Sequence, residues 1–236
     1  MKLDENKKFS AFLFDMDGTL LTSIAAAERV WGAWAQRQGL DPVAFLPTMH
    51  GQRAIDTIRR LELPGLDPET EAANITKAEI EDVDGVVAIA GAAEFLAALP
   101  DDRWAIVTSA SKQLAQRRLE AAGLAIPRVI VTGEDVAIGK PDPQCFLLGA
   151  KRLGVSPSNC LVFEDVEAGV KAGRAAGADV MLVTAVGHGL DLPDIPTMDN
   201  YTNIVPVVSA EGLLSINSIC QPQFGTSARR SVKTVP

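Results

Sequence analysis

Strand and helix patterns alternate along residues 89–184, and this alternation restricts the possible folds more than any other feature of the chain. Short apolar runs bounded by turn residues are typical of buried strands, and most are followed by a segment with helical spacing. Such alternation predicts a parallel sheet with helices on both faces. The expected strands are 11–14, 103–107, 128–132, 160–165 and 179–184, and the expected helices are 92–99, 111–122, 143–153 and 167–176.

The first strand, AFLF at 11–14, is followed by about 65 residues with helical patterns and no strand pattern. That length is too great for a simple crossover within one sheet. We therefore predict an α/β fold with a Rossmann-like, doubly wound parallel sheet core and an inserted all-helical cap domain. The predicted core comprises residues 1–22 and 89–220, and the predicted cap comprises residues 23–88.

Capping and turn signals place the remaining elements. Ser23 is expected to cap a helix that Gly39 ends, and Pro68 suits the start of another helix. The expected elements are helices at 24–38, 43–61, 68–80 and 210–215, an edge strand at 204–208 and a flexible tail at 221–236.

Composition argues against several classes of protein. Asp and Glu total 30 against 22 Lys and Arg, and a net charge of −8 does not suit a nucleic-acid binder. No apolar stretch approaches the roughly 18 residues that a membrane helix needs, so we expect no membrane partner. The three cysteines form no CxxC pair and no disulfide framework, which suits the cytoplasm. A monomer is the default expectation.

Polar side chains follow four of the expected strands. The carboxyl ends of parallel strands meet at one edge of a sheet, where open α/β sheets bind their ligands. The sequence therefore predicts that these side chains converge on one site. They are Asp15 and Asp17 after the first strand, Thr108 and Ser109 after 103–107, Lys140 in the loop after 128–132, and Glu164 and Asp165 at the end of 160–165.

These residue types suit Mg²⁺ and a phosphate group together. Mg²⁺ prefers hard oxygen ligands, which Asp15 and Asp165 can supply. Lys140 can offset the negative charge that a phosphate brings, and Thr108 and Ser109 can donate hydrogen bonds to phosphoryl oxygens.

The two acids after the first strand suit a two-step phosphoryl transfer. A carboxylate is ionised at neutral pH, so Asp15 can attack phosphorus without a general base. The second acid, Asp17, can protonate the leaving oxygen and then deprotonate water.

Four segments with these residues resemble the motifs of the haloacid dehalogenase superfamily, in the same order along the chain. The text around them is similar to that of sugar phosphatases of the superfamily, and the resemblance covers about residues 10–185. The four segments are DMDGTLL at 15–21, VTSAS at 107–111, GKPDP at 139–143 and VFEDVEAG at 162–169.

The resemblance implies a role for each matching residue. Asp15 is expected to be the nucleophile that forms an aspartyl-phosphate. Asp17 is expected to be the general acid and base, with its backbone carbonyl on the metal. Lys140 is expected to bind phosphate and nucleophile, and Asp165 to bind Mg²⁺ directly.

Two points stay open within the resemblance. Glu164 is either a metal ligand or a supporting acid beside the ligands. Either Thr108 or Ser109 holds the phosphate, because members of the superfamily place this hydroxyl one residue apart. In the predicted cap, His50 and Arg53 beside Gly51 are candidates to bind sugar hydroxyls.

Together these expectations describe a cytoplasmic, Mg²⁺-dependent phosphatase that hydrolyses small phosphorylated sugars or polyols. One alternative is a phosphomutase of the β-phosphoglucomutase type, which shares all four motifs and the cap. Another is a catalytically silent binding protein on the same fold. The acids Asp17, Glu164 and Asp165 favour phosphoryl chemistry over dehalogenation, which needs neither the metal nor the second acid.

Overall fold

A six-stranded sheet forms the centre of the computed structural model, which describes residues 7–187, 190 and 192–219. Its strands are β1 (Ala11–Phe14), β4 (Trp104–Val107), β5 (Ile130–Val131), β6 (Cys160–Glu164), β7 (Asp179–Val183) and β8 (Thr197–Met198). They lie in the order β5-β4-β1-β6-β7-β8, and every neighbouring pair is parallel.

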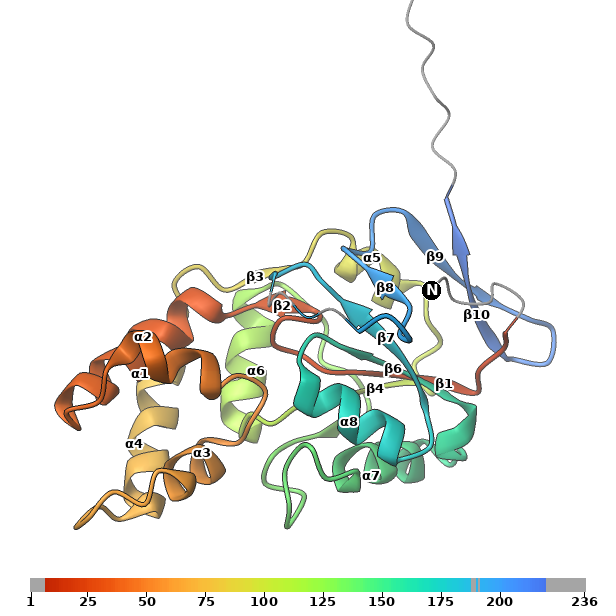
Figure 1. Ribbon diagram of the computed structural model, residues 1–236. Helices are drawn as coiled ribbons and strands as arrows, with labels where there is room; N and C mark the ends of the chain where they lie inside the picture. The colour runs from red at the N-terminus through yellow and green to blue at the C-terminus, as the bar shows by residue number, and fades with distance from the viewer. Residues whose placement is uncertain (1–6, 188–189, 191, 220–236) are drawn as a thin grey trace, which may run out of the picture.

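The strand order reverses at β1, as in Rossmann-like folds. From β1 the chain moves outward through β4 and β5 on one side, and β6, β7 and β8 extend the sheet on the other. Helices cover both faces (Figure 1), which confirms the predicted α/β class. Helices α5 (Ala92–Ala97) and α6 (Lys112–Ala121) pack on one face, and α7 (Gln144–Leu153) and α8 (Glu167–Ala175) pack on the other.

Strand β1 shows why its sequence is apolar without interruption. Successive strand residues point to opposite faces of a sheet. Phe12 and Phe14 join the cluster under α5 and α6, whereas Ala11 and Leu13 join the cluster under α7 and α8. All four are 0% exposed, so both faces of this strand are core.

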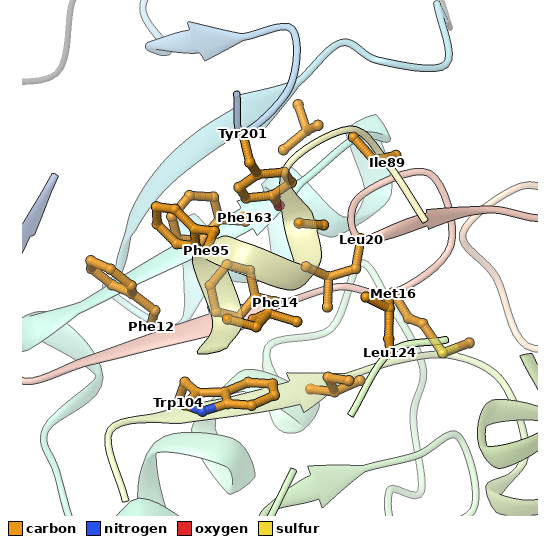
Figure 2. Close-up of a cluster of buried hydrophobic side chains, with 14 of the residues drawn as sticks. Phe12, Phe14, Met16, Leu20, Ile89, Phe95, Trp104, Leu124, Phe163 and Tyr201 are labelled. Carbon is orange, nitrogen blue, oxygen red and sulfur yellow. The ribbon is translucent and has the colours of Figure 1, made fainter. Parts of the chain in front are cut away.

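Aromatic rings dominate the cluster on the α5 side (Figure 2). The rings of Phe14 and Phe163 stack with their centroids 4.5 Å apart. Phe95 of α5 lies 5.1 Å from the ring of Tyr201, which comes from the segment after β8. The carboxyl ends of β1 and β6 are therefore held by rigid packing next to the strand-order reversal.

A group of helices lies between the first two core strands in the sequence and on one side of the sheet (Figure 1). We call residues 23–88 the helical insertion. A short antiparallel ribbon of β2 (Leu21–Thr22) and β3 (Val87–Ala88) carries the chain into and out of it. Its helices are α1 (Ile24–Arg37), α2 (Pro42–Phe45), the 3₁₀ helix η1 (Leu46–Thr48), α3 (Ala54–Arg60) and α4 (Pro68–Glu81).

The helical insertion has a hydrophobic cluster of its own. The rings of Trp31 and Trp34 meet edge to face at 5.7 Å, and both contact Phe45. The two tryptophans therefore belong to the apolar seam of these helices. That the insertion is a separate domain with the stated boundaries stays a prediction.

Two expectations for these helices were wrong in detail. Ser23 does not cap α1, because its hydroxyl donates to Asp17 instead, at 2.6 Å. The single helix expected at 43–61 is divided into α2, the 3₁₀ turn and α3, since Gly51 adopts a φ of +72° that interrupts a right-handed helix.

The expected helix at 210–215 is also wrong. That segment forms a turn and then strand β10 (Leu214–Ser218), which pairs with β9 (Ile204–Val208) in a two-stranded sheet. Leu214 and Ile216 are buried on the core, so the apolar residues follow the two-residue period of a strand. The strand at 204–208 is confirmed, and the expected tail at 221–236 lies outside the described residues.

Within the part of the chain that the structure describes, no helix has the length and apolar character needed to cross a membrane. In that same part, Cys145 and Cys160 are buried and free.

Replacing Phe95 with Ala tests the aromatic cluster. Phe95 is 2% exposed and contacts four aromatic rings, so the cavity left behind should lower the free energy of unfolding by about 3–5 kcal/mol. Urea denaturation measures this change. Val43→Ala, at a side chain that is 82% exposed, is the control and should stay within about 0.5 kcal/mol of the parent. Similar losses in both variants would contradict the assignment of this core.

Candidate active site

A cavity of about 660 Å³ lies beside the carboxyl ends of β1 and β4, where the sheet meets the helical insertion. Asp15, Asp17, Thr108 and Ser109 line it from the sheet side. Residues of α1, α4 and the loop around His50 line it from the insertion. The expected meeting of strand-end side chains therefore occurs next to a space large enough for a small ligand.

Lys140 connects two of the carboxylates at this edge. Its ammonium Nζ lies 2.6 Å from Oδ1 of Asp15 and 2.6 Å from Oε1 of Glu164, and donates to the Val107 carbonyl at 3.2 Å. The Lys140 side chain is 1% exposed. Burial alone would lower the pKa of Lys140, but the two carboxylates outweigh it and the pKa rises, so the lysine stays charged.

Asp15 lies directly after β1 and is nearly as buried, with 8% of its side chain exposed. Its backbone N–H donates to the Phe163 carbonyl, which continues the ladder between β1 and β6. Burial raises the pKa of Asp15 well above its usual range; the Lys140 ammonium opposes this rise, and Glu164 and Asp165 add to it. A further positive charge at this point would favour the ionised carboxylate.

Three of the carboxylates could share a metal ion. One oxygen from each of Asp15, Glu164 and Asp165 lies within 4.8 Å of the other two. With all three ionised, Lys140 neutralises one charge and leaves two negative charges in a buried place. Hard oxygen donors with this excess charge fit a divalent cation such as Mg²⁺.

Both carboxylate oxygens of Glu164 already have partners. Oε1 accepts from Lys140, and Oε2 accepts from the backbone N–H groups of Asp165 and Val166 at 2.9 and 3.3 Å. A Cβ at Gly169 in α8 would lie 1.7 Å from Oε1, so only glycine leaves room for this carboxylate. These contacts favour the interpretation that Glu164 holds Lys140 and does not bind the metal directly. Its role in the site stays a prediction.

Asp165 packs against the loop that follows β1. Thr19 donates to its Oδ1 at 3.3 Å, and a Cβ at Gly18 would lie 1.8 Å from its Oδ2. Gly18 also has a backbone φ of +88°, which residues with a side chain rarely adopt. Glycine at position 18 is thus needed both for the turn and for the approach of Asp165.

Asp17 points to a different set of partners. Its Oδ1 accepts from the Ser23 hydroxyl at 2.6 Å and lies 3.0 Å from Nη1 of Arg118. Nη2 of Arg118 lies 2.9 Å from Oε1 of Glu79, which belongs to α4 of the helical insertion. The carboxylate of Asp17 is not part of the three-acid group around Lys140, and a metal contact through its backbone carbonyl stays a prediction.

The two hydroxyls after β4 have different environments. Thr108 is buried, and its Oγ1 accepts from the Ala110 N–H at 3.1 Å. Ser109 donates to the Gly51 carbonyl of the helical insertion at 2.8 Å. Both line the cavity, so the question of which one holds a phosphate stays open.

The two candidate residues of the insertion also line the cavity. Nε2 of His50 lies 3.7 Å from Oε1 of Glu28. Arg53 forms a two-point ion pair with Asp56, and it donates to three backbone carbonyls at positions 133, 136 and 137 of the loop that carries Lys140. In this structure Arg53 joins the insertion to that loop, and its role with sugar hydroxyls stays a prediction.

Sequence reasoning missed three residues that support the site. Arg118 forms an ion pair with Asp17, Glu79 forms one with Arg118, and the Tyr201 hydroxyl donates to the Thr19 carbonyl at 3.0 Å. Each charged residue falls four positions after a buried apolar residue of its helix, Leu114 or Ile75. A charge on the buried face of a helix was therefore the available signal for Arg118 and Glu79, whereas nothing in the sequence pointed to Tyr201.

Comparisons with known proteins find similar chains. A family model for haloacid dehalogenase-like hydrolases matches residues 9–177. Hexitol phosphatase A of Escherichia coli is 45% identical over 182 residues, which cover 74% of this chain and 82% of that protein. Glycerol-1-phosphate phosphohydrolase 2 of Saccharomyces cerevisiae is 34% identical over 190 residues, 74% of each chain. A HAD family hydrolase from Deinococcus radiodurans, solved with bound phosphate and sodium, is 31% identical with a TM-score of 0.55, covering 79% of this chain and 84% of that one.

Replacing Gly18 with Ala tests the contact with Asp165. The new methyl group would overlap a carboxylate oxygen, so the variant should lose about 1–3 kcal/mol of unfolding free energy beyond the backbone strain. Gly85→Ala is the matched control, because Gly85 has a φ of +80° and no atom within 4 Å of an added Cβ. Chemical denaturation compares the two variants, and equal losses would show that Asp165 does not occupy this position.

The loop that carries Lys140 offers a test by pH. Asp135 accepts from Arg152 and from the N–H and hydroxyl of Thr132. The bond from Arg152, with those from Thr132, lowers the pKa of Asp135 from 3.8 to about 2. Because the folded pKa lies below the unfolded one, the stabilisation is present above the unfolded pKa and disappears as pH falls through the folded pKa.

Asp135→Asn should therefore reduce the free energy of unfolding by about 1 kcal/mol at neutral pH, a value that allows for solvent screening. The difference from the parent should shrink as the pH falls from about 4 towards 2. Urea denaturation at a series of pH values measures this. A difference that stays constant over that interval would contradict the ion pair.

Proposed function

Since this chain belongs to the haloacid dehalogenase-like hydrolase family, we propose that it is a Mg²⁺-dependent phosphatase of small phosphorylated sugars or polyols. One observation carries the proposal. Asp15 lies at the carboxyl end of β1, 2.6 Å from a buried lysine and beside two further carboxylates, and it lines the cavity. This arrangement supplies a nucleophile, a cation for phosphate and a metal site within a few ångströms.

In the first step, a carboxylate oxygen of Asp15 attacks the phosphorus atom of the substrate. The bond from phosphorus to the sugar or polyol oxygen breaks, and Asp17 gives its proton to that oxygen. The products of this step are the free alcohol and a phosphorylated Asp15.

In the second step, a water molecule attacks the phosphorus atom, and Asp17 takes a proton from the water. The bond between phosphorus and the carboxylate oxygen breaks, which releases inorganic phosphate and restores Asp15. Each residue thus returns to its starting state.

The other side chains of the site bind and orient the phosphoryl group. Lys140 and a hydroxyl from Thr108 or Ser109 would contact its oxygens. The carboxylates of Asp15 and Asp165, with the backbone carbonyl of Asp17, would hold Mg²⁺. When bound, Mg²⁺ supplies positive charge that offsets the repulsion between substrate phosphate and carboxylates.

The similar proteins and the cavity support this substrate class. The two curated relatives are named for the hydrolysis of hexitol phosphates and glycerol 1-phosphate. The cavity is bounded by the helical insertion, which we propose acts as a cap that excludes bulk water around the leaving group. The same proposal describes a cytoplasmic monomer with a small phosphorylated metabolite as its partner.

A phosphomutase would need to hold a second phosphate at the far end of the substrate. Arg53 of the insertion faces this cavity, but its guanidinium is engaged with Asp56 and backbone carbonyls. These contacts leave Arg53 less available for a second phosphate, which supports the proposal of hydrolysis.

Hydrolysis of p-nitrophenyl phosphate with and without EDTA tests the proposed function. We expect metal-dependent release of phosphate that Asp15→Asn abolishes, because an amide cannot act as the nucleophile. Asp17→Asn should reduce turnover roughly 10²-fold or more, the scale of general acid catalysis. Turnover that is unaffected by EDTA and by Asp15→Asn would refute the proposal, and wild-type rates in Asp17→Asn would remove that residue from the mechanism.

A further inference from the structure

The proposed chemistry gives one charged pair that lines the cavity no direct contact with the substrate. Arg118 of α6 and Glu79 of α4 line the cavity, with Nη2 of Arg118 2.9 Å from Oε1 of Glu79. Their side chains are 7% and 8% exposed, so more than nine-tenths of each is buried. The pair therefore joins the core to the helical insertion inside the ligand space.

The pair lies next to Asp17, the proposed general acid. Asp17 must reach the leaving oxygen of the substrate to give it a proton. Nη1 of Arg118 lies 3.0 Å from Oδ1 of Asp17, and Glu79 is bonded to the same guanidinium. A leaving group in contact with Asp17 consequently has its next atoms within reach of Arg118 and Glu79.

The charge of the pair indicates what kind of leaving group fits. Together Arg118 and Glu79 are neutral, so the pair itself has no net attraction for a second phosphate. A guanidinium has five N–H donors and a carboxylate about four acceptor positions, and their mutual contact uses only some of each. Hydroxyl groups, which both donate and accept, match such a site.

Stability does not explain the pair well. Burying two charges costs free energy that a single contact often fails to recover. Burial raises the pKa of Glu79, and the Arg118 charge offsets this only in part. The insertion is also attached to the core by Arg53 and by the Ser109 hydroxyl, so a further attachment is not needed.

We propose that Glu79 and Arg118 form the subsite that binds the hydroxyl groups of a neutral, polyhydroxylated leaving group. This inference rests on the proposed function and adds the residues that select the substrate class. Glu79 accepts from substrate hydroxyls and Arg118 donates to them, while the pair stays close to Asp17.

The test compares two phosphate esters of equal chain length, hexitol 6-phosphate and n-hexyl phosphate. The full-length enzyme and Glu79→Gln are assayed for kcat and KM with both esters. A lost hydrogen bond to a charged group should reduce kcat/KM for the hexitol ester about 10- to 100-fold, mostly through KM. The hexyl ester, which has no hydroxyl to bind, should change less than about 2-fold.

Two further variants make the result specific. Glu79→Asp replaces Glu79→Gln in the test if the latter does not fold. It keeps the charge but shortens the side chain, so the carboxylate no longer reaches the substrate, and the preference for the hexitol ester should fall. Asp82→Asn is the matched control. Asp82 also forms an ion pair with an arginine of the insertion, Arg29, but this pair lines a different cavity. This variant should leave both esters unchanged.

Equal losses with both esters would show that the pair only attaches the insertion, and no loss with either would show that it does not touch substrate. Either result overturns this inference while the phosphatase proposal stands. If the parent enzyme hydrolyses neither ester nor p-nitrophenyl phosphate, the proposed function fails and this inference fails with it.

Discussion

The ammonium of Lys140 is the interaction that makes this arrangement of strands possible. Three carboxylates, those of Asp15, Glu164 and Asp165, lie at neighbouring strand ends in a buried place. Without a cation among them their mutual repulsion would oppose the close pairing of β1 and β6. Lys140 comes from the loop after β5. Its ammonium contacts the carboxylates of Asp15 and Glu164 and the Val107 carbonyl, so one charged group joins the ends of β1, β6 and β4. Such buried charges remain favourable only when geometry and further hydrogen bonds are good, which explains the backbone donors to Glu164.

The site belongs to the core and to the helical insertion together. The core supplies the acids and the lysine, and the insertion closes the cavity from the other side. Contacts between the two use polar groups that also face the ligand space, namely Ser109 with Gly51 and Arg118 with Glu79. A ligand in the cavity would therefore compete with contacts that hold the insertion in place, and its binding would be coupled to the position of the insertion.

The sequence was sufficient for five of the six strands of the sheet, all except β8, and for the acids at its edge. Short unbroken apolar runs bounded by turn residues, such as 11–14 and 160–163, are typical of strands buried on both faces, and parallel strands bring their carboxyl ends together. Hydrogen-bond partners were harder to predict. The local sequence suggested that Ser23 caps a helix, but its hydroxyl donates to Asp17 instead. The segment 210–215 has no two-residue alternation of its own, and the strand that begins at Leu214 depends on pairing with β9. Arg118 and Glu79 meet only after α4 and α6 are packed, so no local pattern could pair them.

Tyr201 gives the segment after β8 an importance that its sequence does not suggest. Its ring packs on Phe95, and its hydroxyl holds the turn that carries Gly18 and Thr19. The family match ends at residue 177, well before this tyrosine. A fragment trimmed to the matched region would keep every acid and the lysine, yet the turn after β1 would lose its anchor and the aromatic core would be opened to water. The folded unit that supports these acids therefore extends beyond the signature motifs, to a residue that takes no part in the proposed chemistry.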